Sequence, residues 1–304
     1  MKRIIALALV VCSLGAMLCS CNRRLDLYEA YYLDSEMSKT DCDYEIRSSD
    51  YNKPSKSYYM KKNIALNKIN KPEKSITING ENIPLEYRET QKTEFSKYKM
   101  NTFESREHLL VASYRDDTDE LVFLLPGNYK YQIATTISSE QELIQASNAV
   151  LSNYMDSKGY TIEITTKASY QSTDGFVVPE DGIKAQYEVD YINYIDGVKA
   201  GELVRVTVDS DGYLQALHMQ MAGEYEDYKD LDIDEEKYNE VLSSEVRAIC
   251  DIEGYTLTGW SENKILVIER GILCVWSVVT PQYEGENGHE PIAQSIELLI
   301  PVAK

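Results

Sequence analysis

The chain has few side chains that could do chemistry, and its three histidines set the limit. They are His108, His218 and His289, and none has a second histidine at the spacing of a metal site. Neither H-E-x-x-H nor G-x-S-x-G occurs, and both phosphate-binding glycine loops are missing from the sequence. A cysteine nucleophile would need His218 to meet Cys250 or Cys274 in space. We expect His218 to take an ordinary place in a strand, and the protein to be no enzyme and to use no cofactor.

The best metal candidate is the run Asp230, Asp232 and Asp234. The pattern D-x-D-x-D opens a calcium loop, but Glu235 stands where the loop needs glycine and Val241 where it needs a bidentate glutamate. Capping and charging the start of a following helix explains the aspartates more simply. A weak calcium site stays as the alternative.

Acidic residues dominate the end of the chain. The whole sequence has 31 Lys and Arg against 50 Asp and Glu, which gives a formal net charge of −19. Nucleic acid is therefore disfavoured as a partner, because affinity for phosphate backbones comes from basic side chains. The run Tyr225, Glu226, Asp227 and Tyr228 concentrates the acidity, so it is either a docking surface for a partner or a solvated loop.

The N-terminus resembles the signal of a bacterial lipoprotein. Lys2 and Arg3 precede an apolar run from Ile4 to Leu18, which is shorter than the ~20 residues of a membrane span. Leu18-Cys19-Ser20-Cys21 then resembles a lipobox. The resemblance implies removal of residues 1–20, lipidation of Cys21 and attachment to the extracytoplasmic face of the cell membrane. A plain signal peptide cut near Ser20 is the alternative.

Residues 21–74 show no sustained hydrophobic periodicity, and we expect a flexible tether. Seven lysines against Asp50 and Glu73 make the stretch 50–74 locally basic. Cys42 falls in this polar segment, whereas Cys250 and Cys274 take apolar-like positions in predicted elements. Two buried thiols are favoured for that pair, and a disulfide between them stays open.

A repeat at an offset of 95 residues organises the remainder. The segment 155–162 recurs as 250–257, and the turn at 116–117 and the helix start at 139–140 recur at 211–212 and 234–235. This predicts two tandem modules of about 95 residues, over 75–200 (with an extra N-terminal hairpin) and 201–304.

Each module is expected to hold a hairpin, one helix and further antiparallel strands. Ser139, with Glu142 in a capping box, and Asp234 are predicted helix caps, and the helices are predicted to end at Gly159 and Gly254. The predicted apolar stripes are Leu143, Ala146, Val150 and Tyr154 in the first helix, and Tyr238, Leu242, Val246 and Ile249 in the second. The expected fold class is α+β, with an antiparallel sheet and one helix on one of its faces in each module.

The segment 191–198, followed by 201–213, resembles the hairpin pattern of PepSY-type domains. These domains occur in peptidase propeptides, spore-germination proteins and extracytoplasmic lipoproteins. The resemblance implies a non-catalytic binding or regulatory role, with a peptidase, a membrane sensor or a cell-wall component as partner. It carries over no catalytic residue. Alternatives are a carbohydrate- or peptidoglycan-binding lipoprotein and a cryptic hydrolase.

Overall fold

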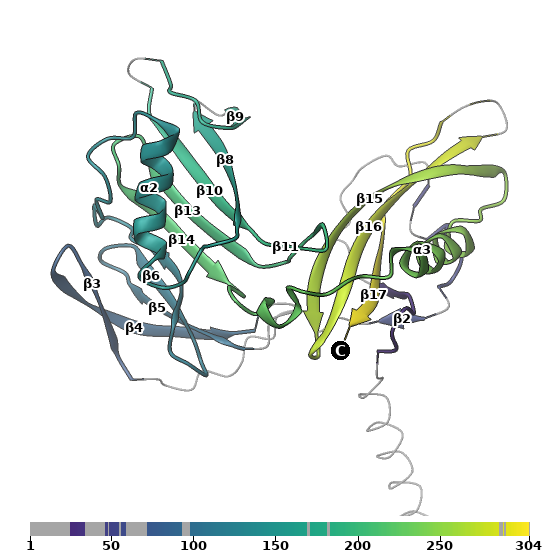
Figure 1. Cartoon of the computed structure of the whole chain (residues 1–304), viewed down its shortest axis with the longest axis horizontal. Helices are drawn as coiled ribbons and strands as arrows, with labels where there is room; N and C mark the ends of the chain where they lie inside the picture. Colours follow the sequence, from purple (N-terminus) through teal and green to yellow (C-terminus); the bar gives the residue numbers. More distant parts are fainter. Residues whose placement is uncertain are drawn as a thin grey trace, which may run out of the picture.

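The computed structural model shows two β-sheets side by side, each with one long helix against it (Figure 1). The structure describes residues 25–33, 46–47, 49–54, 56–58, 72–92, 98–168, 171–180, 183–285, 288 and 290–303. The expected signal segment 1–20, Cys21, Cys42 and His289 lie outside the described residues. Within those residues, no helix is long and apolar enough to cross a membrane.

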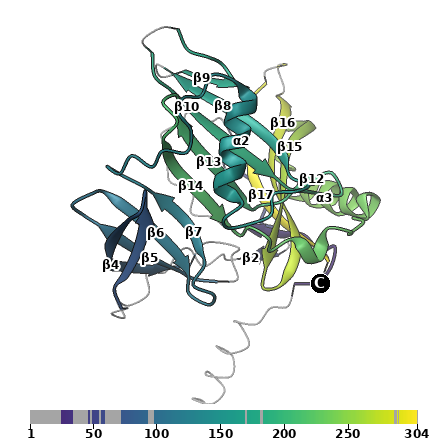
Figure 2. The same cartoon turned by 60° about the vertical axis from the view of Figure 1, so that its left-hand side comes forward.

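The first sheet has ten strands, all of which pair antiparallel with their neighbours. In spatial order they are β3 (Lys74–Ile78), β4 (Glu81–Gln91), β5 (Met100–Ser105), β6 (Leu110–Arg115), β7 (Leu121–Leu125), β14 (Leu214–Gln220), β13 (Leu203–Asp209), β10 (Ala185–Ile192), β8 (Thr161–Ala168) and β9 (Gln171–Asp174). Helix α2 (Glu140–Leu151) packs on one face of this sheet (Figure 2). We call this sheet and α2 the large lobe.

The start of α2 matches the expected cap in part. Ser139 Oγ accepts a hydrogen bond of 3.3 Å from the backbone N–H of Glu142. The Glu142 carboxylate accepts from the N–H and hydroxyl of Ser138, so the second half of the capping box is displaced by one residue. The helix ends at Leu151 rather than at Gly159. The side chain of Asn153 donates to the carbonyl of Ala149, which satisfies an orphan carbonyl without a glycine.

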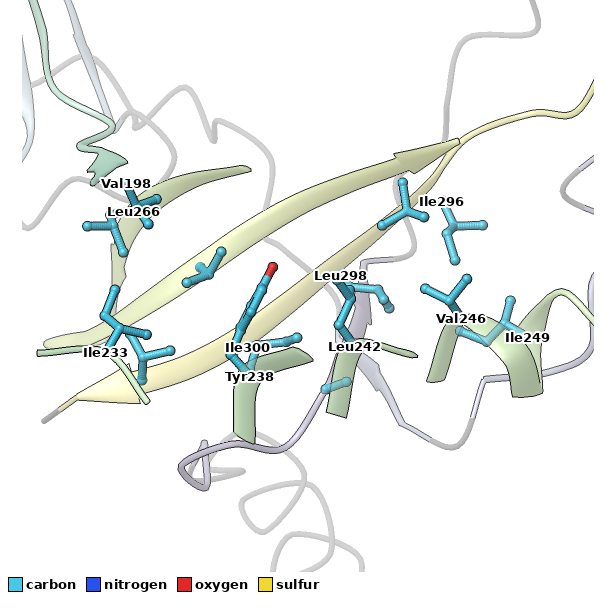
Figure 3. Packing of buried hydrophobic residues seen from close by; sticks show 14 of the residues in the cluster. Val198, Ile233, Tyr238, Leu242, Val246, Ile249, Leu266, Ile296, Leu298 and Ile300 are labelled. Carbon is cyan, nitrogen blue, oxygen red and sulfur yellow. The ribbon is translucent and has the colours of Figure 1, made fainter. Parts of the chain in front are cut away.

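The second sheet and its helix form the small lobe. Its strands, in spatial order, are β15 (Tyr255–Glu269), β16 (Ile272–Gly285), β17 (Ile296–Ala303), β1 (Tyr31–Leu33) and β2 (Ser57–Tyr58). Helix α3 (Glu235–Ile249) begins after Asp234, whose carboxylate accepts from the Lys237 N–H at 3.0 Å, as predicted. This helix also ends before its predicted glycine. The buried stripe of α3 is the predicted one and faces β17 (Figure 3). It consists of Tyr238, Leu242, Val246 and Ile249.

The expected tether is wrong for the part that the structure describes, because this segment packs into the small lobe. Leu25 is only 1% exposed, and Tyr31 opens strand β1, which pairs with β17. Ile46 is buried in the same lobe, and Lys56 forms an ion pair with Glu29. A few apolar side chains and two short strands are enough to fix a segment of polar composition.

The expected α+β fold of two 95-residue modules is also wrong. Strands account for 49% of the residues that the structure describes and helices for 13%, so the fold is mostly β. The large sheet also takes strands from both expected modules, because β13 and β14 follow residue 200 and are inserted between β10 and β7. Six residue pairs join β10 to β13, from Gln186 with Asp209 to Tyr191 with Val204. The boundary expected at 200/201 therefore separates strands that hydrogen bond to each other.

A small ribbon and a turn join the two lobes. Strands β11 (Tyr194–Ile195) and β12 (Val198–Lys199) lead to Ala200, which bridges to Leu266 in β15. The Leu266 carbonyl accepts the Gly201 N–H at 2.7 Å and the Tyr225 hydroxyl at 3.0 Å. Tyr225 directly precedes a short 3-10 helix, η1 (Glu226–Tyr228). The carbonyl oxygen of Leu266 in the small lobe thus accepts hydrogen bonds from two separate positions, Gly201 and Tyr225, at the joint between the lobes.

Candidate functional site

Two faces of the large sheet differ in the kind of side chain they carry. Along β10, Tyr187 and Val189 point into the core with α2, while Gln186, Glu188 and Asp190 alternate with them and stay half-buried. We call the second face, which turns away from α2, the open face. It continues onto β8 at Lys167, which lies opposite Gln186, and onto β13 at Arg205, which lies opposite Asp190.

A row of ion pairs crosses three strands of the open face. Lys167 Nζ lies 2.6 Å from one carboxylate oxygen of Glu188, and Arg205 Nη1 lies 3.1 Å from the other. Arg205 also donates two parallel hydrogen bonds to the carboxylate of Asp190, of 2.5 and 2.8 Å. The side chains of Glu188 and Asp190 are only 13% and 20% exposed. Such paired, half-buried charges are held in one geometry, unlike solitary surface charges.

An open pocket of about 520 Å³ lies at one end of this row. Strands β8, β9, β10, β13 and β14 all contribute to its lining. Two cations, Lys167 and Lys184, stand among amide side chains, and each is paired with a carboxylate; the Lys184 partner is Asp211 at 2.5 Å. The amides are those of Gln171, Gln186 and Gln215. Because an amide both donates and accepts, this lining can match peptide groups or other neutral polar groups.

His218 lies on the open face and is built into the sheet. It pairs with Arg205 across the strands, and its ring lies 4.8 Å from that of Phe123. Burial, followed by the charge of Arg205, lowers the pKa of His218, so the imidazole is neutral near pH 7. This agrees with the predicted place in a strand. His108, the other described histidine, packs against Tyr129 in a tilted arrangement, with 4.6 Å between the ring centres.

The described residues bring no cysteine to His218, which belongs to the large lobe. Cys250 directly follows α3 on the helix side of the small sheet, and Cys274 lies in the core on the opposite face of that sheet. Both thiols are free and buried, as predicted. Burial raises the pKa of the Cys250 thiol to about 11 and that of Cys274 further, so neither forms a thiolate readily at neutral pH.

The run 225–228 is only partly the exposed surface that its composition suggests. Tyr225 is fully buried at the joint between the lobes, so it cannot contact a partner there. Tyr228 is half-buried and donates to the carbonyl of Gly271 at 3.4 Å, while Glu226 and Asp227 are exposed. The structure therefore assigns the two tyrosines to packing and leaves only the two acids accessible.

The three aspartates of the weak calcium hypothesis do not form a site. Asp234 caps α3, and Asp230 and Asp232 are exposed. Across the described ranges, no three His, Cys, Asp or Glu side chains are grouped so that they could hold a metal ion.

The sequence did not predict the open face. The alternation Gln186, Glu188, Asp190 was visible, but the partners in β8 and β13 appear only once the strand order is known.

Comparison with known proteins found no family model, no curated protein and no solved structure that matches this chain. The resemblance to PepSY-type domains therefore stays a prediction, and the function has to be argued from the site.

Proposed function

We propose that the protein is a membrane-anchored extracytoplasmic lipoprotein, attached through Cys21, that binds a protein or peptide partner on the open face and performs no catalysis. The observation that supports this most directly is the fixed row from Lys167 through Glu188 and Arg205 to Asp190, with the open pocket beside it. Charged groups that are already held in place lose little freedom on binding, and they favour one partner over others.

The lining of the pocket favours a polypeptide over a glycan. An extended peptide presents one donor and one acceptor per residue, which the glutamine amides can match. Sugar sites commonly offer an aromatic ring for stacking, and none of the described residues that line this pocket is aromatic. A carbohydrate- or peptidoglycan-binding role is therefore the less favoured candidate.

Site-specific photo-crosslinking in growing cells tests the proposal. A photoreactive amino acid at Gln171, which is exposed and lines the pocket, should give one discrete protein adduct. The same amino acid at Ser244, exposed on α3, is the matched control and should give none. Lys184→Glu reverses a lining charge on a side chain that is 77% exposed, so it should reduce the adduct severalfold without unfolding the protein.

Lys158→Glu makes the same charge change at an exposed position that does not line the pocket, and it should leave the adduct unchanged. Equal adducts from Gln171 and Ser244, or equal effects of the two lysine variants, would contradict binding at the open face. Retention of the purified protein on isolated cell wall, abolished by Lys184→Glu, would favour the glycan alternative. A Cys21→Ala protein that stays membrane-bound would overturn the anchor.

A further inference from the structure

The described chain begins at one particular end of the small lobe. Leu25 is buried there in a core cluster with Val267 and Leu299. Figure 1 shows that this end also holds the turn between β15 and β16 and the end of β17, beside the mark of the C-terminus. The first described residues therefore share one end of the lobe with the tip of its longest hairpin.

This beginning is fastened by backbone hydrogen bonds as well as by burial. The N–H of Tyr28 donates to the carbonyl of Pro301 at 2.8 Å, and the N–H of Asp26 donates to the Tyr31 hydroxyl at 3.0 Å. Tyr31 and Tyr32 then pair with β17 in the sheet. Pulling the chain away from the lobe would break these bonds and expose Leu25, so residues 25–33 cannot act as a loose spacer.

From these contacts, and resting on the proposed lipid anchor at Cys21, we infer that the β15–β16 tip of the small lobe lies against the lipid headgroups of the membrane. Leu25 follows Cys21 by four residues. At most about 3.5 Å per residue, these span roughly 14 Å, less than the thickness of a folded lobe. The anchor thus sets both the height and the orientation of the small lobe, and the partner of this end is a bilayer surface.

The charged groups described at the tip do not drive this contact. Near the tip, Arg270 pairs with Glu269, and Tyr228 ties η1 to Gly271, which brings the exposed acids Glu226 and Asp227 to the same end. Those acids favour no attraction to anionic headgroups. The contact between the tip and the headgroups should therefore form on vesicles of phosphatidylcholine alone, and it should not require phosphatidylglycerol.

The length of the β15–β16 hairpin allows the distance of each of its two ends from the membrane to be tested separately. Strand β15 runs over 15 residues from Tyr255 to Glu269, which corresponds to roughly 45 Å at ~3.3 Å per residue. Two exposed positions mark its ends: Arg270 at the tip, and Glu284, which pairs with Thr256 at the far end. Fluorophores attached to Arg270→Cys or to Glu284→Cys will report on the two ends separately. Cys42→Ser removes the thiol of the N-terminal segment, and the buried Cys250 and Cys274 do not compete for the label.

The mature lipidated protein, purified from membranes, is reconstituted into phosphatidylcholine vesicles that contain nitroxide-headgroup lipid. The label at Arg270 should be quenched severalfold more than the label at Glu284. A flexible Gly-Ser segment of about 20 residues inserted before Leu25, with an average span of roughly 25 Å, should abolish the difference while the protein stays bound.

Equal quenching at Arg270 and Glu284 in the uninserted protein would overturn the orientation and leave the anchor intact. A difference that survives the insertion, or that needs phosphatidylglycerol, would also overturn it, because the surface of the lobe would then bind lipid by itself. The failure of the anchor is recognised separately, since a Cys21→Ala protein would then remain on the vesicles.

Discussion

The joint between the lobes depends on the missing side chain of Gly201, so Gly201→Ala should weaken it. A Cβ at this position would lie 2.6 Å from the carbonyl oxygen of Leu266, 3.1 Å from the Tyr225 hydroxyl and 3.3 Å from a methyl group of Val267. The nearest of these atoms belongs to the backbone of β15, which pairs with β16 along its length. The strand cannot yield without disturbing the sheet, so the connecting chain has to move away from it.

The expected loss follows from the bonds at that oxygen. It accepts the Gly201 N–H at 2.7 Å and the Tyr225 hydroxyl at 3.0 Å, and each bond contributes about 0.5–1.5 kcal/mol. Loss of both lowers the free energy of unfolding by about 1–3 kcal/mol. Alanine also restricts the unfolded chain more than glycine does, which raises the free energy of unfolding by about 0.4–1 kcal/mol. With the middle of each range, the net destabilisation should be about 1.3 kcal/mol.

Urea unfolding followed by tryptophan fluorescence measures this loss. Trp260 and Trp276, the two tryptophans of the sequence, lie in β15 and β16, so the signal reports the small lobe. The matched control is Gly259→Ala, within β15 itself, where a Cβ would meet only the Gln282 side chain at 3.4 Å. The control should shift the free energy by less than about 0.5 kcal/mol. Equal unfolding midpoints for the two variants would refute the role given to Gly201.

Three further outcomes are expected. Arg205→Ala takes the ion pair from the half-buried Asp190 and leaves Glu188 with Lys167 alone, so it should lower the free energy of unfolding by about 1–3 kcal/mol. The exposed Lys184→Ala should lower it by less than ~0.5 kcal/mol, and urea unfolding with circular dichroism measures both. Glu202, directly before β13, is only 6% exposed, and this burial raises its pKa. Stability should therefore fall as the pH rises from the unfolded pKa of about 4.3 through the folded pKa, and Glu202→Gln should abolish this loss in thermal scans. Leu25→Ala should destabilise the small lobe by about 2–4 kcal/mol in tryptophan-monitored unfolding, whereas the 39% exposed Leu27→Ala should change it by less than ~0.5.

Each outcome has a clear opposite. A neutral Arg205→Ala would mean that the ion-pair row contributes nothing to folding. A Glu202→Gln protein with the wild-type pH profile would show that another group sets the dependence. Equal effects of Leu25→Ala and Leu27→Ala would mean that residues 25–33 do not pack as described, and the inferred membrane orientation would lose its basis.

Local features of this fold could be predicted from the sequence, but the order of its strands could not. The cap at Asp234 and the Asp211-Gly212 turn depend on neighbours in the chain, and both form. Alternation along a strand tells which residues share a face, but it does not tell which strand lies next to it. That is why β13 and β14 were assigned to a second module, although they complete the large sheet. A strand of three residues such as β1 leaves no periodic signal at all.

The same distinction explains the site. Glu188 and Asp190 alternate with buried residues in the sequence, but their pairing with Arg205 depends on a register that only the folded sheet reveals. The exposed position expected for Tyr225 is wrong for a different reason. Its acidic neighbours suggest exposure, yet its hydroxyl donates to the backbone carbonyl of Leu266 in β15, and this makes full burial favourable.

The pairing of β1 with β17 constrains the order in which the protein can fold. Tyr31 and its partner Leu299 come from opposite ends of the chain, and the core around them also needs Leu25. During synthesis, strand β1 emerges before β17 and must remain without this partner until residues 296–303 follow. Contacts so distant in sequence form late and slowly. A chain without β17 would therefore keep an unpaired N-terminal segment, which proteases can recognise, so that segment is protected only once β17 has joined the sheet.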